Sequence, residues 1–171
     1  MNKVFRVLSV LALVLVWSQN ARAEEPRQIG TYGDWSAYVF MEGTNKVCYM
    51  AAQPKKAEGN YSSRDPIFAL ITHRPAENTH NVFSYITGYA YKPGGDATVT
   101  IDGSRHVLFT QDDTAWAPDA DTDSLLSLKI RSGSSMVVEG TSSRGTATKD
   151  TFGLKGSGAA LDAINKECGL M

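Results

Sequence analysis

The sequence predicts an all-β fold, a β-sandwich or barrel, with a short helix at its C-terminus. After residue 31, short apolar runs recur between turn residues about every eight to twelve positions, which is the strand spacing of such folds. The pair Asp102-Gly103 lies between two alternating apolar segments and is typical of a β-hairpin. Apolar residues within 157–168 recur at spacings of three and four, which predicts an amphipathic helix.

The first 23 residues have the pattern of a secretory signal peptide. Two basic residues precede a ten-residue apolar run, 7–16, and 21–23 reads Ala-Arg-Ala, a small-x-small cleavage site. The run has about half of the roughly 20 residues that a membrane-spanning helix needs. Cleavage before Glu24 removes three basic and no acidic residues, so 24–171 would form one β-sandwich domain of charge −4. We expect this domain in the periplasm or outer envelope, or secreted, with no transmembrane segment.

Alternating or continuous apolar segments bounded by turn residues predict eight strands in this domain. Residues 24–31 are polar and are expected to be frayed, 54–66 is expected to be a long exposed loop, and 112–123 is expected to be a second polar loop. Segment 124–132 alternates like a strand, but acidic capping residues precede it and Gly133 follows it, so we predict a short helix. The predicted strands are 35–41, 47–53, 67–73, 81–91, 98–101, 105–110, 136–142 and 146–154.

Composition and motifs exclude several classes of function. A hydrophobic content of 42% with 3 Trp, 7 Tyr and 6 Phe excludes a wholly disordered chain. A net charge of −1 gives no basis for nucleic-acid binding. The sequence has no Gly-x-Ser-x-Gly nucleophile elbow, no phosphate loop and no dinucleotide-binding fingerprint. We therefore expect that the protein is not an enzyme and that it binds no cofactor.

The two cysteines, Cys48 and Cys168, are the only ones in the chain. In an oxidising compartment such a pair is expected to form a disulfide. It would join an early strand to the C-terminal helix. The alternative, two free thiols with a redox role, lacks a Cys-x-x-Cys pair.

Two groups of side chains are weak candidates for metal binding. The histidines lack the spacing of a zinc site, so the simpler interpretation is three half-exposed surface histidines. The aspartates fail the EF-hand pattern, which needs Gly at its sixth and Glu at its twelfth position, so an acidic helix N-terminus is the simpler interpretation. A metal-assisted hydrolase remains a lesser alternative function. The two groups are His73, His80 and His106, and Asp119, Asp121 and Asp123.

The predicted strand 81–91 has a row of aromatic residues. Phe83, Tyr85, Tyr89 and Tyr91 share one parity and therefore point to one face. If this face is open to solvent, the tyrosines Tyr85, Tyr89 and Tyr91 form a binding face for a sugar or a partner protein. If it faces the other sheet, the tyrosines belong to the core.

Several segments are recognisable by their order along the chain. They are Gly33-Asp34-Trp35, Cys48-Tyr49-Met50, Gly88-Tyr89, Tyr91-Lys92, Ala115-Trp116-Ala117, Ser142-Ser143-Arg144-Gly145-Thr146, Asp150-Thr151-Phe152-Gly153-Leu154-Lys155-Gly156, Ala159-Ala160-Leu161 and Cys168. In this order they resemble the invasion-associated locus B family of bacterial exported proteins. The resemblance extends from about Gly33 to Gly169. A second disulfide found in some relatives is excluded, because 38–41 contains no cysteine. The family's frequent Ser-Leu-x-Gly is replaced by Gly-Leu-Lys-Gly at 153–156.

The resemblance implies an immunoglobulin-like β-sandwich in the envelope of an alphaproteobacterium and a virulence role in host-cell invasion, best described for erythrocytes. It implies neither catalytic residues nor a cofactor. The expected function is therefore that of an exported, non-enzymatic binding protein with a protein or glycan partner on the envelope or the host cell. Binding would use the stretches 54–66 and 112–123, or the tyrosine face. The alternative is a structural periplasmic protein that supports envelope integrity.

Overall fold

The structure is a computed structural model that describes residues 25–170. The predicted signal peptide, 1–23, lies outside the described residues. The elements are β1 Arg27–Tyr32, β2 Trp35–Glu42, β3 Asn45–Ala52, β4 Lys56–Gly59, β5 Phe68–Arg74, the 3-10 helix η1 Pro75–Glu77, β6 Thr79–Ile86, β7 Ala97–Ile101, β8 Ser104–Gln111, β9 Thr114–Trp116, α1 Ala120–Ser132, β10 Ser135–Thr141, β11 Ala147–Gly153 and α2 Ser157–Glu167.

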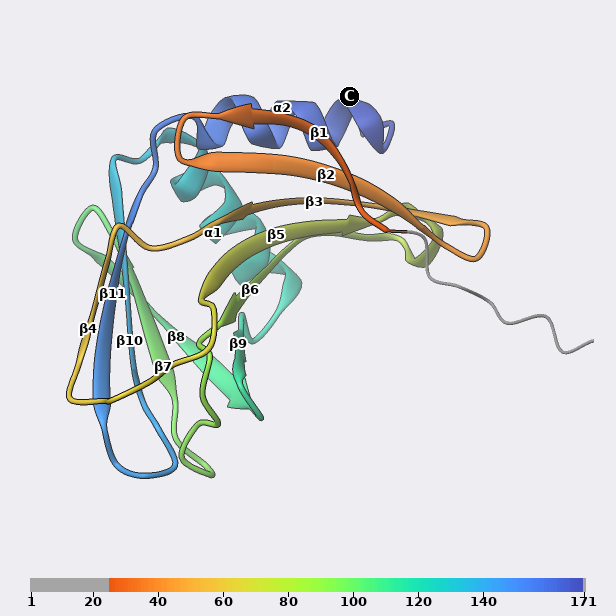
Figure 1. Ribbon diagram of the computed structural model, residues 1–171. Coiled ribbons are helices and arrows are strands. Elements are labelled where there is room, and N and C mark those ends of the chain that lie inside the picture. Colours follow the sequence, from red (N-terminus) through yellow and green to blue (C-terminus); the bar gives the residue numbers. More distant parts are fainter. Residues whose placement is uncertain (1–24, 171) are drawn as a thin grey trace, which may run out of the picture.

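The strands form one antiparallel sheet in the order β1-β2-β3-β5-β6-β9-β8-β7-β10-β11-β4. Its two halves meet at β8, where 104–108 pairs with β7 and 109–111 pairs with β9. Figure 1 shows the two halves running in different directions, with β1, β2 and β3 across the top of the view and β4, β10 and β11 down its left side. The predicted all-β, sandwich-like fold is confirmed, with the two layers continuous through a shared strand.

A single hydrophobic core lies between the two halves of the sheet and under the helices. In β2 the alternate residues Trp35, Ala37 and Val39 are buried, as the period-two pattern requires. The indole Nε1 of Trp35 donates to the Gly153 carbonyl at 3.1 Å, which satisfies its polar atom at the junction with β11. Both halves of the sheet therefore contribute to the same packed interior.

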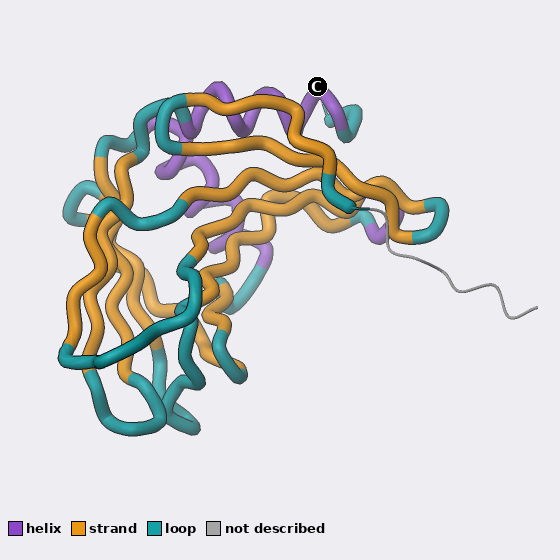
Figure 2. The backbone as a smooth tube through the Cα atoms, in the orientation of Figure 1, coloured by secondary structure: helices purple, strands orange, loops and turns teal. Residues whose placement is uncertain are grey.

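Both predicted helices are present and cover the β1-β2-β3-β5-β6 half of the sheet (Figures 1 and 2). Helix α2 buries Ala160, Leu161 and Ile164. Helix α1 begins earlier than predicted, at Ala120, because Asp119 caps it: Oδ1 accepts from the Thr122 amide at 2.7 Å. The carboxylate also complements the positive end of the helix.

The predicted disulfide is confirmed. Cys48 in β3 is bonded to Cys168, which directly follows α2, and the described residues contain no free cysteine. The bond closes a segment of 120 residues and fastens the C-terminal helix to the sheet.

Four local predictions are wrong. Within the N-terminal stretch 24–31, residues 27–31 are not frayed, because they belong to β1, which pairs with β2. The stretches 54–66 and 112–123 contain the short strands β4 and β9. The strand predicted at 81–91 ends at Ile86, because Gly88 adopts a positive φ of +73° and turns the chain out of the sheet.

Candidate functional site

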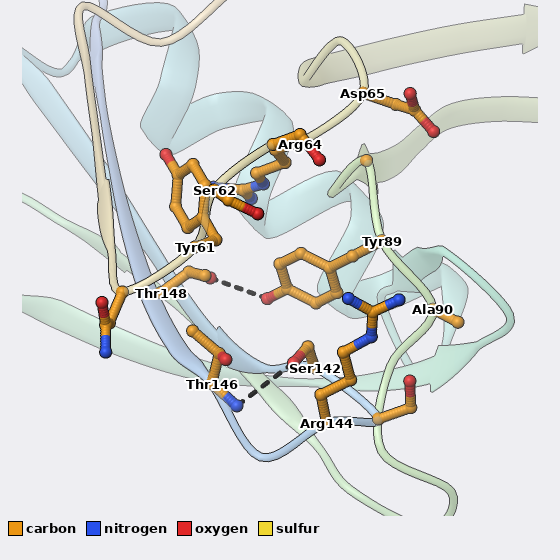
Figure 3. A pocket seen from close by; sticks show the side chains of 14 residues that line it. Tyr61, Ser62, Arg64, Asp65, Tyr89, Ala90, Ser142, Arg144, Thr146 and Thr148 are labelled. Atoms are coloured by element: carbon orange, nitrogen blue, oxygen red, sulfur yellow. Dashed lines mark hydrogen bonds between the residues drawn. The ribbon is translucent and has the colours of Figure 1, made fainter.

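A cleft of about 530 Å³ opens beside Tyr89 (Figure 3). Loop 60–65 forms one wall and turn 142–146 forms the other, while 88–90 and Thr148 complete the lining. Its volume lies within the range of about 300–1,000 Å³ that is usual for small-molecule sites. Most of the lining side chains bear hydroxyls, two are tyrosines and two are arginines.

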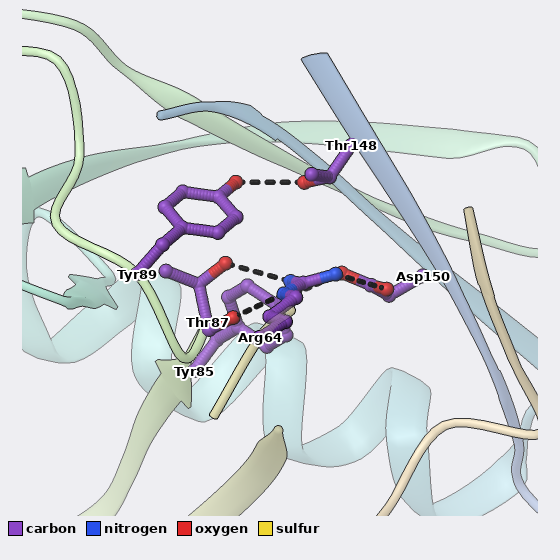
Figure 4. Close-up of polar contacts among 6 residues, drawn as sticks. All are labelled: Arg64, Tyr85, Thr87, Tyr89, Thr148 and Asp150. Carbon is purple, nitrogen blue, oxygen red and sulfur yellow. Dashed lines mark hydrogen bonds and ion pairs between the residues drawn. The ribbon is translucent and has the colours of Figure 1, made fainter. Parts of the chain in front are cut away.

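The loop wall is fixed by Arg64, whose side chain is only 4% exposed (Figure 4). Its Nη1 and Nη2 donate to the two carboxylate oxygens of Asp150 in β11 at 2.8 and 2.7 Å. Its Nε donates to the Thr87 carbonyl at 2.5 Å, and Nη2 also donates to the Thr87 hydroxyl at 2.8 Å. The Tyr85 hydroxyl accepts from Nη2 at 3.0 Å and donates to Asp150. All three guanidinium nitrogens are therefore engaged within the protein.

This network neutralises charges that would otherwise be costly to bury. The Asp150 side chain is fully buried, and a buried carboxylate is tolerated only when it is paired and hydrogen-bonded. Burial is the largest single influence on the pKa of Arg64 and lowers it. The hydrogen bonds to Asp150, with the charges of Asp150 and Tyr85, together raise the pKa more, so its net shift is upward. Burial raises the pKa of Tyr85, and the charge of Asp150 adds to the effect. At neutral pH Arg64 is thus a cation and Tyr85 a neutral phenol.

The backbone of the loop also contacts the segment that leaves β6. The Asp65 amide donates to the Gly88 carbonyl at 3.1 Å. A Cβ atom at Gly88 would lie 2.2 Å from the Asp65 carbonyl oxygen. Only glycine allows this approach, which sets the position of the loop wall relative to Tyr89.

The opposite wall is a tight turn closed by its own hydrogen bonds. The Ser142 amide donates to the Thr146 carbonyl at 2.9 Å, and the Gly145 amide donates to the Ser142 carbonyl at 2.8 Å. The Ser143 amide donates to the Ala90 carbonyl at 2.8 Å, which joins the turn to the Tyr89 segment. Arg144 lies within this turn and is exposed.

The three tyrosines predicted as a binding face do not form one. Tyr85 and Tyr91 are buried, with 1% and 6% of their surface exposed, so the alternative assignment to the core applies to both. Tyr89 is half-buried and lines the cleft, where its hydroxyl lies 2.7 Å from the Thr148 hydroxyl. Tyr85 lies within β6 on the same face as Phe83, and this face packs into the core, where Tyr85 meets Phe152 of β11 edge-on. Tyr89 and Tyr91 lie beyond the end of β6 at Ile86, so they do not continue the parity of the strand.

The structure brings together only part of the predicted metal-binding groups. The rings of His73 and His80 lie 6.2 Å apart, whereas His106 lies on β8 opposite Val99 of β7. His73 is fully buried, contrary to the expected half-exposed position. Within residues 25–170 no three His, Cys, Asp or Glu side chains are arranged to hold a metal ion.

The aspartates 119, 121 and 123 form the acidic start of α1, as the simpler interpretation states. Asp119 is the N-cap and Asp121 lies in the first turn. Asp123 is buried, and its Oδ1 accepts from the Phe83 amide at 2.8 Å. Burial raises the pKa of Asp123, although this hydrogen bond opposes the shift.

An aromatic surface not singled out in the sequence lies on the side of β2 and β3 that faces away from the core. Tyr38 and Tyr49 stack with centroids 5.0 Å apart, and Phe40 meets Tyr49 edge-on at 6.0 Å. All three are half-buried. Their alternation with Trp35, Ala37 and Val39 is the signal that indicates this second face.

The principal residues of the cleft were also missed in the sequence. The predicted loop 54–66 does supply one wall, but neither Arg64 nor Arg144 was a candidate. One signal was present: Asp150 shares strand parity with Phe152, a core residue, and a carboxylate in a buried row requires a cationic partner.

Comparison with known proteins identifies the family. The profile of the invasion associated locus B (IalB) protein family matches residues 35–165. No curated protein and no solved structure matches the chain. In residues 25–170 no helix is both long and apolar enough to cross a membrane. The match spans α1, most of α2 and all strands except β1, together with both walls of the cleft. The chain therefore belongs to the invasion associated locus B family.

Proposed function

We propose that this protein is an exported, non-enzymatic binding protein of the bacterial envelope that takes part in host-cell invasion. We further propose that it holds its ligand in the cleft beside Tyr89. Family membership supports the invasion-associated role. The single observation that supports binding in the cleft is the fixed pair of walls, one anchored by Arg64 and the other a hydrogen-bonded turn.

The chemistry of the lining favours binding over catalysis. Serine hydroxyls line the cleft, but no histidine is among its lining residues, and a serine nucleophile normally needs such a base. The buried Arg64–Asp150 pair is directed into the protein, so it holds the wall rather than reacting with a ligand.

A deletion strain tests the proposed role. We expect the deletion to lower invasion while growth in detergent stays normal, and the wild-type gene to restore invasion. A gene carrying Tyr61→Ala and Arg144→Gln should fail to restore it despite normal amounts of exported protein. Sensitivity of the deletion strain to detergent, with no adhesion by the purified protein, would instead indicate the structural envelope role.

The hydrolase alternative has a separate test. Metal analysis of protein purified without a histidine tag should find no stoichiometric metal. One bound metal per chain, lost with His73→Gln or His80→Gln, would favour the hydrolase over a binding protein.

A further inference from the structure

The two arginines of the cleft differ in whether another side chain of the protein neutralises their charge. Arg64 is buried and bonded to Asp150, so its charge is neutralised internally. Arg144 is exposed, and its side chain makes no ion pair or hydrogen bond within residues 25–170. Figure 3 shows the Arg144 side chain extending from the turn toward Tyr89, while the Asp65 carboxylate on the opposite wall points away from both. The lining therefore contains one guanidinium and one carboxylate that are not paired within the described residues, and of these only Arg144 is directed toward Tyr89.

Hydroxyl groups line both walls of the cleft. Ser62 and Ser63 belong to the loop wall, and Ser143 belongs to the turn. The hydroxyls of these three serines have no hydrogen-bond partner within the described part of the chain. A hydroxyl can donate and accept, which matches the hydroxyls of a sugar ring more closely than it matches an apolar side chain.

The rings of Tyr61 and Tyr89 also line the cleft, and both lie close to the Arg64 guanidinium. The Arg64 guanidinium carbon lies 4.9 Å from the Tyr89 ring centroid and 5.5 Å from that of Tyr61. This cation–π contact fixes the rings within the cleft. Tyrosine supplies a flat apolar surface together with a polar end, which suits a ligand with both C–H and O–H faces.

We propose that the ligand is an acidic saccharide, with a sugar carboxylate bound to Arg144 and ring hydroxyls bound to the serines. This inference rests on the proposed function of the cleft. A single guanidinium balances one carboxylate in a two-pronged hydrogen bond. A phosphate group, which carries close to two negative charges, would remain only partly balanced.

Binding of matched sugars to the full-length protein purified after export tests this proposal. The probes are glucuronic acid, galacturonic acid and N-acetylneuraminic acid, each paired with its methyl ester, which keeps the shape and removes the charge. We expect at least one acid to bind about tenfold or more tightly than its ester, because hydrogen bonds to charged groups are the stronger ones. Arg144→Gln should remove this preference.

The matched control is Arg105→Gln. Arg105 is also exposed, but it lies on β8 opposite Thr100 and does not line the cleft, so this variant should keep the preference.

Equal binding of acid and ester, or no binding of any probe, would overturn the saccharide proposal. If no probe binds but Arg144→Gln still lowers host-cell adhesion, the ligand class is wrong and the proposed function stands. If an acid binds through Arg144 but adhesion is unchanged, the proposed function is wrong.

Discussion

Arg64 and Asp150 form a two-pronged ion pair across 86 residues of sequence, with both contacts at 2.7–2.8 Å. The pair connects β11 to the loop between β4 and β5, which runs from one half of the sheet to the other. Both side chains are buried, so movement of the loop away from β11 would leave the Asp150 carboxylate in the core without its partner, which is energetically costly. The cleft is therefore built on a rigid base although one of its walls is a loop.

Removal of one partner should destabilise the whole fold. We expect Asp150→Ala to lower the free energy of unfolding by about 3–5 kcal/mol, because it leaves a buried, unpaired guanidinium. Urea denaturation followed by tryptophan fluorescence measures the change. Asp162→Ala, which breaks the exposed ion pair with Arg131, serves as the control and should have little effect. Equal effects of the two variants would contradict the role given to Arg64.

Replacement of Gly88 should destabilise the protein for a steric reason. Gly88→Ala places a Cβ atom 2.2 Å from the Asp65 carbonyl oxygen, so we expect displacement of the loop wall as well as backbone strain. Gly94→Ala is the matched control, because its φ of +69° is similar but nothing lies within 4 Å of the added atom. Gly94→Ala should therefore cost about 1 kcal/mol from strain alone, and Gly88→Ala should cost more. Similar unfolding midpoints for the two variants would show that the close contact is unimportant.

His73 should make stability depend on pH. Burial lowers its pKa to about 4, and the nearby His80 acts in the same direction. Unfolded histidine titrates near pH 6.5, so the unfolded state binds more protons between about pH 6.5 and 4. Stability should therefore fall as pH decreases through this window, by about 3 kcal/mol in total from this residue.

Unfolding free energies measured at several pH values, for the wild type and for His73→Gln, isolate this contribution. The dependence between pH 6.5 and 4 should be smaller in His73→Gln, whereas the control His106→Gln should keep it. An unchanged dependence in His73→Gln would assign the effect to other groups.

Reduction of the disulfide should loosen the C-terminal helix. The bond between Cys48 and Cys168 closes a segment of 120 residues, so its loss should lower the free energy of unfolding by about 2–5 kcal/mol. Cys48→Ser with Cys168→Ser provides the same comparison without a reductant. Thiol titration of the exported protein should find no free thiol, and two free thiols would contradict the bond.

The sequence predicts the central strands well because their pattern is local. Trp35, Ala37 and Val39 alternate in β2 and are buried together, so the period alone identifies the strand. The strands β1 and β4 lie at the edges of the sheet, where each pairs with only one neighbour and polar side chains are tolerated. Their formation depends on that neighbour rather than on their own pattern, which is why they were predicted as irregular.

The site is less predictable than the fold because it is made of distant residues. Arg64 and Asp150 are joined only by the folded topology, and no spacing in the sequence connects them. The tyrosine face was predicted on the assumption that strand parity continues to Tyr91, but the turn at Gly88 ends it. The single local signal was a carboxylate in a buried row of β11.

The central claim is that the cleft beside Tyr89 is the binding site, and adhesion of the purified exported protein to host cells tests it most directly. The double variant Tyr61→Ala, Arg144→Gln changes two cleft residues, and Tyr38→Ala, Arg105→Gln makes the same changes outside the cleft. We predict at least about a tenfold loss of affinity for the first, since hydrogen bonds to a charged group contribute about 1.5–3 kcal/mol, and none for the second. Unchanged adhesion of the cleft variant would contradict the account. If the variant Tyr38→Ala, Arg105→Gln also lost adhesion, the aromatic surface of β2 and β3 would be the better candidate for the binding site.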